Sequence, residues 1–114
     1  MILILGGTTE GKKAVGIAEE AGKTYYYSTK GDEQEISLQH GIRLTGALTQ
    51  TTMKAFCRKN GIRLLVDAAH PFAEQLHATV TAVSQALGIP CVRYERMYDD
   101  LFKLFNEEMY DEYP

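Results

Sequence analysis

The sequence has no tryptophan, only two cysteines and no long run of apolar residues. A membrane span needs roughly 18–20 apolar residues in a row, so no association with a membrane is expected. The N-terminus lacks the basic segment of a secretory signal, and a net charge of -3 at pH 7 offers no basic surface for a nucleic acid. Cys57 and Cys91 lack C-x-x-C spacing, which favours reduced thiols in a cytoplasmic protein over a metal or redox site.

The 114 residues suffice for one globular domain, and the opening stretch MILILGGTTEG organises it. The apolar run Ile2–Leu5 predicts a strand buried on both faces, and the two glycines after it predict a tight turn. An amphipathic pattern follows at once, so a helix begins with its free N–H groups directed at the turn. These are the parts of a phosphate-binding βα unit, for which an anion is the natural ligand.

The rest of the lobe alternates between strand and helix patterns. Further strands are expected over 25–27, 42–45, 62–68 and 91–94, and helices from the glycine turn to about residue 21, over 49–60 and over 72–87. This alternation predicts an α/β fold, with an open, mostly parallel five-stranded sheet of Rossmann or flavodoxin type and helices on both faces. Ligands bind such sheets beyond the carboxyl ends of the strands, where the strand order reverses.

Residues 97–114 form an acidic tail after this lobe of residues 1–96. Leu101, Phe105 and Met109 recur at helical spacing, so the tail is expected to be an amphipathic helix. Such a helix could cover an edge of the sheet, pack on a part that the chain lacks, or join two copies into a homodimer.

The glycine turn matches the dinucleotide motif G-x-G-x-x-G only in part. Gly6, Thr8 and Gly11 fit it if Thr8 replaces the middle glycine, where its hydroxyl could add a contact to a phosphate. The alternative is a tight turn with Thr8 or Thr9 as a helix N-cap. Lys13 stands where a P-loop has Ser or Thr, so phosphoryl transfer from ATP is not favoured.

Two later loops carry the other candidate residues. The second strand ends in Ser28, Thr29 and Lys30, which suit the 2′-phosphate of NADP because no carboxylate is there to repel it; the alternative is a solvated loop. His70 follows the strand that ends at Asp67, where its imidazole could contact an anion or move a proton, and Pro71 fits the first turn of the next helix. The alternative is a capped helix start with an exposed histidine.

Neither His77 nor any metal-binding motif in the sequence indicates a further functional site. His77 is expected to be a surface or packing residue. No spacing of metal ligands and no G-x-S-x-G sequence is found, so neither a metal nor a Ser/His/Asp triad is predicted.

Three segments together resemble the precorrin-6A reductase family, including its cobalt-precorrin-6A form: ILGGTTEG at 4–11, DAAHPFA at 67–73 and PCVRYER at 90–96. The resemblance implies two Rossmann-like lobes with the active site between them. It also implies NADPH-dependent reduction of a C=C bond of the precorrin-6A or cobalt-precorrin-6A macrocycle in cobalamin biosynthesis. The implied site residues are Gly6, Gly7, Thr8, Thr9, Ser28, Thr29, Lys30 and Gly46 for the cofactor, and His70, Pro71 and Phe72 for the substrate.

The sequence departs from that family in two ways. The resemblance covers only the N-terminal lobe, and Met97 follows Arg96 where the family has a proline. We therefore expect a missing C-terminal lobe as partner and weak or no reductase activity in the chain alone. His70 is the candidate catalytic group, although the resemblance assigns no proton donor. The alternative function is a non-catalytic nucleotide- or phosphate-binding module.

Overall fold

Five strands, all parallel, form a single sheet in the order β3-β2-β1-β4-β5. They belong to a computed structural model that describes residues 1–94 and Phe105. The elements in chain order are β1 Ile2–Leu5, α1 Thr9–Glu20, β2 Tyr25–Thr29, β3 Gly41–Thr45, α2 Gln50–Lys59, β4 Leu64–Asp67, α3 Glu74–Leu87 and β5 Cys91–Arg93. The predicted α/β fold with its five-stranded parallel sheet is confirmed.

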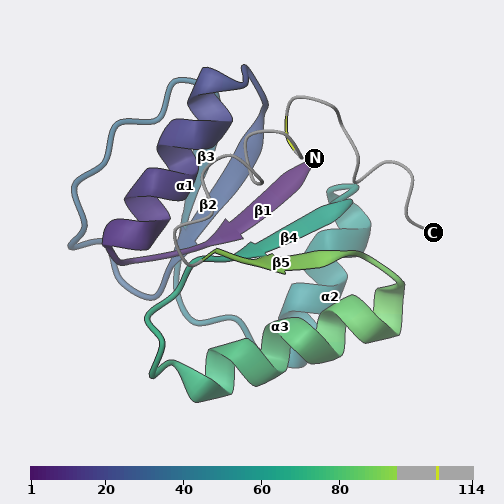
Figure 1. Ribbon diagram of the computed structural model, residues 1–114. Helices are drawn as coiled ribbons and strands as arrows, with labels where there is room; N and C mark the ends of the chain where they lie inside the picture. The colour runs from purple at the N-terminus through teal and green to yellow at the C-terminus, as the bar shows by residue number, and fades with distance from the viewer. Residues whose placement is uncertain (95–104, 106–114) are drawn as a thin grey trace.

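The chain winds in two directions from the centre of the sheet (Figure 1). From β1 it passes through α1 to β2 and then to the edge strand β3, and from there it crosses back to β4 and β5 through α2 and α3. Helix α1 covers one face of the sheet, while α2 and α3 lie together on the other (Figure 1). The strand order therefore reverses between β1 and β4, which is the point where such sheets bind ligands.

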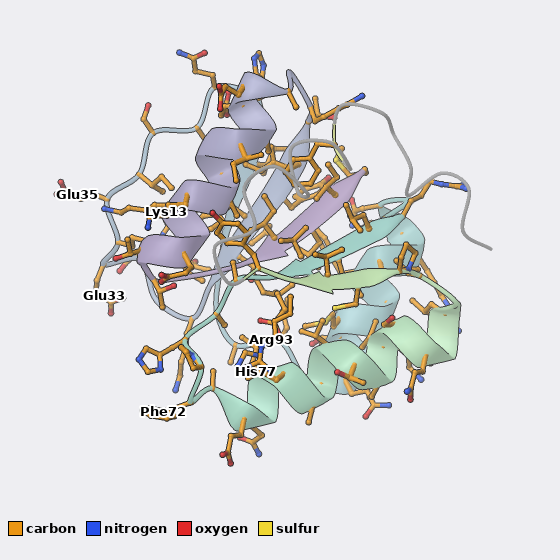
Figure 2. The ribbon with its side chains drawn as sticks, in the orientation of Figure 1. Lys13, Glu33, Glu35, Phe72, His77 and Arg93 are labelled. Atoms are coloured by element: carbon orange, nitrogen blue, oxygen red, sulfur yellow. The ribbon has the colours of Figure 1, made fainter. Side chains whose placement is uncertain are left out.

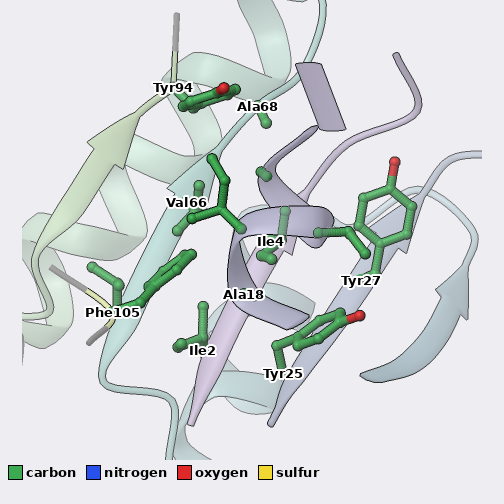
Figure 3. Packing of buried hydrophobic residues seen from close by; sticks show 13 residues of the cluster. Ile2, Ile4, Ala18, Tyr25, Tyr27, Val66, Ala68, Tyr94 and Phe105 are labelled. Carbon is green, nitrogen blue, oxygen red and sulfur yellow. The ribbon is translucent and has the colours of Figure 1, made fainter. Parts of the chain in front are cut away.

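Strand β1 has no exposed side, because its residues alternate between two cores. Ile2 and Ile4 pack under α1, whereas Leu3 and Leu5 pack under α2 and α3. Phe105 is fully buried in the first core and lies beside Val66 of β4 (Figure 3). The other residues of the predicted tail helix lie outside the described part of the chain. Within that part, no helix combines the length and apolar character that a membrane span requires.

Helix α3 begins at Glu74, two residues later than the predicted start at residue 72. The reason is a turn before it, in which the N–H of Phe72 donates to the ring of His70 (3.1 Å) and the N–H of Ala73 to the His70 carbonyl (2.9 Å). Pro71 therefore precedes the helix and is not in its first turn. Phe72, expected in the buried stripe of the helix, is 84% exposed.

Residues 30–40 join β2 to β3 without a helix, and Glu19 of α1 holds their end in place. One carboxylate oxygen of Glu19 accepts hydrogen bonds from the Tyr25 hydroxyl (2.5 Å) and from the N–H groups of Gln39 and His40 (2.9 Å each). Burial alone would raise the pKa of Glu19, but these hydrogen bonds and the nearby His40 outweigh it, so the pKa is lowered from its usual value of 4.5.

We predict that Glu19→Gln lowers the free energy of unfolding at pH 7 by about 1–2 kcal/mol, because charged acceptors make the stronger hydrogen bonds. A lowered carboxyl pKa stabilises the fold above about pH 4.5, and this contribution disappears as the pH falls through the lower folded-state pKa. Urea unfolding at pH 7 and in steps below pH 4.5 should show the two proteins converging. Glu35→Gln, an exposed change in the same loop, serves as control; a constant difference at every pH would contradict the account.

Candidate functional site

An open cleft of about 1070 Å³ lies at the carboxyl ends of the strands. It is bordered by the glycine turn after β1, the end of β2, the segment between β3 and α2, and the loop between β4 and α3. These loops are the ones predicted from the sequence, and they meet at the reversal point of the strand order. The predicted site residues that line the cleft are Gly6, Gly7, Thr8, Ser28, Thr29, Lys30, Gly46, His70 and Phe72; Thr9 and Pro71 do not line it.

The glycine turn is shaped by the ring of Tyr27, which occupies the space that side chains would need. A Cβ placed on Gly6 would lie 2.5 Å from the Tyr27 hydroxyl oxygen, and one on Gly11 would lie 2.6 Å from it. Gly7 has φ +110°, a conformation that L side chains rarely adopt, and its N–H donates to the same hydroxyl at 3.0 Å. The hydroxyl in turn donates to Gln34 at 2.5 Å. Gly6 and Gly11 therefore allow the Tyr27 ring to pack closely against the turn.

Thr8 is the N-cap of α1, and its hydroxyl is already occupied. It accepts from the N–H of Gly11 (3.4 Å) and donates to the carbonyl of Ala68 (3.1 Å), which belongs to the loop after β4. The predicted contact from this hydroxyl to a phosphate would require the bond to Ala68 to break. In the structure the hydroxyl ties two walls of the cleft together.

Backbone N–H groups at the start of α1 are the better candidates for holding an anion. The N–H groups of Thr8, Thr9 and Glu10 have no partner among the described residues, although that of Gly11 is capped. Because the positive end of the helix dipole lies at the same place, a phosphate or carboxylate would be stabilised there. Thr9 does not line the cleft, so any part it takes in holding an anion would be through this N–H group.

The end of β2 offers one free ammonium group and, against expectation, one carboxylate. Thr29 is fully engaged, since its hydroxyl donates to Gly31 (2.6 Å) and accepts two N–H groups of Arg43 (2.9 and 3.1 Å). Lys30 is exposed in the cleft and makes no ion pair with a described residue. Glu33 also lines the cleft, because its carboxylate folds back over Gly31. The prediction that no carboxylate lies near this end was wrong, since the turn at Gly31 returns the chain to the cleft.

His70 lies at the tip of the loop between β4 and α3. Its Nδ1 accepts the N–H of Phe72, so a neutral ring carries its proton on Nε2, which has no partner among the described residues. The ring of Phe72 stands 5.2 Å away, centre to centre, and projects from the molecule at the mouth of the cleft (Figure 2). One polar and one apolar ring are thus presented together to whatever occupies the cleft.

Beneath this loop lies a pair that the sequence did not reveal. Asp67, 4% exposed, accepts from the N–H of Ala69 (3.2 Å) and contacts Nδ1 of His77 at 2.5 Å. The other ring nitrogen of His77 lies 2.9 Å from the carbonyl of His70. His77 was expected to be a surface or packing residue, and the structure shows it supporting the loop. No cluster of three or more metal-ligating side chains occurs in the described part of the chain.

The strand order and the place of the cleft define an open α/β protein with a ligand site at its topological switch point. Comparison with known proteins identifies the family within this class. A model of the family "Precorrin-6x reductase CbiJ/CobK" matches residues 1–109, and the chain belongs to that family.

Individual relatives agree with this assignment. The chain is 32% identical to the cobalt-precorrin-6A reductase of Priestia megaterium over 99 residues and 31% identical to that of Synechocystis sp. over 98 residues. These matches cover 84% and 83% of the chain but 38% of each relative. A solved structure of the precorrin-6A reductase CobK has a TM-score of 0.75 at 26% identity, over 83% of the chain and 38% of that protein. The chain thus spans well under half the length of the relatives it matches.

We predict that Gly6→Ala destabilises the protein by about 1–3 kcal/mol, because its Cβ would overlap the Tyr27 ring. Gly16→Ala is the matched control: nothing lies within 4 Å of its added Cβ on the exposed side of α1, so it should stabilise by about 0.5–1 kcal/mol. Denaturant unfolding of both variants measures the contrast. Equal effects would mean that Tyr27 does not pack on the turn as described.

Proposed function

We propose that this chain is the cofactor-binding lobe of an NADPH-dependent reductase that acts on precorrin-6A or cobalt-precorrin-6A in cobalamin biosynthesis. The observation that carries the proposal is that the helix start at Thr8, Lys30 and His70 meet at one cleft at the switch point of the sheet, with the N–H of Thr8 and the ammonium of Lys30 unpaired among the described residues. Membership of the reductase family and the names of its relatives support it.

The residues of the cleft fit the groups of a dinucleotide. Gly6 and Gly7 keep side chains away from the helix start, where the N–H groups of Thr8, Thr9 and Glu10 would hold the pyrophosphate. Ser28 and Lys30 would contact the 2′-phosphate, with Thr29 and Arg43 fixing the backbone around them. Gly46, whose φ is +108° and which has open space around it, leaves room for the adenosine end.

The rest of the cleft suits the nicotinamide end of the cofactor and the substrate that it would reduce. When bound, NADPH would supply a hydride to one carbon of the reduced C=C bond. We assign substrate contact to the rings of His70 and Phe72, and to Pro71 the shape of their loop. His70 is the candidate proton donor, because its Nε2 is the ring nitrogen left without a partner among the described residues.

A second lobe would close this site, because relatives of the chain are much longer and the cleft is open. Closure would exclude water and orient the substrate. We therefore expect weak or no reductase activity from the chain alone. Steady oxidation of NADPH by the chain with its tetrapyrrole substrate would contradict this.

The cofactor assignment predicts that NADPH binds more tightly than NADH, as measured by nicotinamide fluorescence. Lys30→Ala should weaken NADPH binding about fivefold to tenfold and leave NADH binding nearly unchanged, because only NADPH carries the 2′-phosphate. Lys13→Ala is the matched control, since Lys13 is an exposed lysine of α1 that does not line the cleft and lies well apart from Phe72 in Figure 2. Equal binding of the two nucleotides would favour a general nucleotide- or phosphate-binding module, and no binding would refute the assignment.

A change at Glu33 should alter NADPH affinity in the opposite direction to Lys30→Ala. Its carboxylate lies in the same part of the cleft as Lys30, so it should repel the 2′-phosphate. We predict that Glu33→Gln tightens NADPH binding by about twofold to fivefold, with less effect on NADH. The ratio of the two affinities is the measurement, and Glu35→Gln is the control. A loss of NADPH affinity in Glu33→Gln would place the 2′-phosphate elsewhere.

A further inference from the structure

One histidine lies between two hydrogen-bond acceptors, a buried carboxylate and a backbone carbonyl of the loop that carries the His70 ring. Nδ1 of His77 is 2.5 Å from the Asp67 carboxylate, and Nε2 is 2.9 Å from the His70 carbonyl oxygen. The His77 side chain is 12% exposed and that of Asp67 is 4% exposed. The pair is therefore largely shielded from water, which makes each of these contacts matter.

Counting protons restricts the state of this pair. A carbonyl oxygen only accepts, so Nε2 of His77 must carry a proton. An ionised Asp67 also only accepts, so Nδ1 beside it must carry a proton as well, whereas a protonated Asp67 would donate to a bare Nδ1. In both states the Nε2–H of His77 donates to the His70 carbonyl.

We propose that His77 is a positioning residue: Asp67 holds its ring through Nδ1, and its Nε2–H clamps the His70 carbonyl and so sets the His70 ring in the cleft. The same carbonyl also accepts the N–H of Ala73, the N-cap of α3, so the clamp acts on the turn that precedes this helix. It thereby fixes the turn in which the N–H of Phe72 holds Nδ1 of His70. Only the expected effect on ligand binding rests on the proposed function, and the clamp itself does not.

Nitrogen-15 NMR of the histidine rings tests the clamp directly on the wild-type chain. We expect Nε2 of His77 to carry a proton, because it faces the His70 carbonyl oxygen. In Asp67→Asn the side chain can still hydrogen-bond to Nδ1, so we expect the bond from Nε2 to His70 to persist. A bare Nε2 on His77 in the wild type would overturn the proposal, whatever the variants do.

A second measurement asks whether the clamp matters for binding. His77→Ala removes the donor to the His70 carbonyl and should weaken NADPH binding about threefold to tenfold, which is the effect of one hydrogen bond. His77→Gln, whose amide N–H can donate to the same carbonyl, should restore part of the affinity, and His40→Gln, a change outside the cleft, should bind as the wild type does. Equal NADPH affinity in the wild type and His77→Ala would show that the pair does not position the site. If the wild type binds no NADPH, the proposed function fails, while the NMR result still decides the state of the pair.

Discussion

A hydrogen bond from the Thr8 side chain joins the two loops that face each other across the cleft. The hydroxyl of Thr8 donates to the carbonyl of Ala68, 60 residues away in sequence, and accepts the N–H of Gly11. The same group therefore starts α1 and fixes the distance between the glycine turn and the loop that carries His70. Both the free N–H groups of the helix start and the position of the histidine depend on this contact. This hydrogen bond connects the loops after β1 and β4, the two strands between which the strand order reverses.

The fold could be predicted because its central strands are buried on both faces and read as apolar runs. Ile2–Leu5 and the segment 62–68 predicted the neighbouring strands β1 and β4, and glycines and caps marked most helix ends. The start of α3 could not be predicted, because it depends on the ring of His70 taking the N–H of Phe72. The His70 side chain offers this N–H a hydrogen bond outside the helix, and the spacing of apolar residues does not indicate such a local side-chain contact.

The convergence of the candidate site could also be predicted, since carboxyl ends of parallel strands meet at one edge. The glycine turn, Lys30 and His70 do line one cleft. Glu33 was missed because its approach depends on how the turn at Gly31 folds back. The Asp67–His77 pair was missed for a similar reason: it requires knowing which side of α3 faces the end of β4. The one available signal was a histidine one turn into the helix that follows a strand ending in an acid.

The central claim is that the cleft of this chain holds NADPH, with its phosphates at the start of α1. The most direct test is a set of backbone ¹H–¹⁵N spectra of the chain titrated with NADPH. The account predicts the largest shifts at the N–H groups of Thr8, Thr9 and Glu10, with a second group of shifts around Lys30. Shifts confined to the opposite end of the sheet, around Arg58 and Gly61, or no shifts at saturating NADPH, would contradict it.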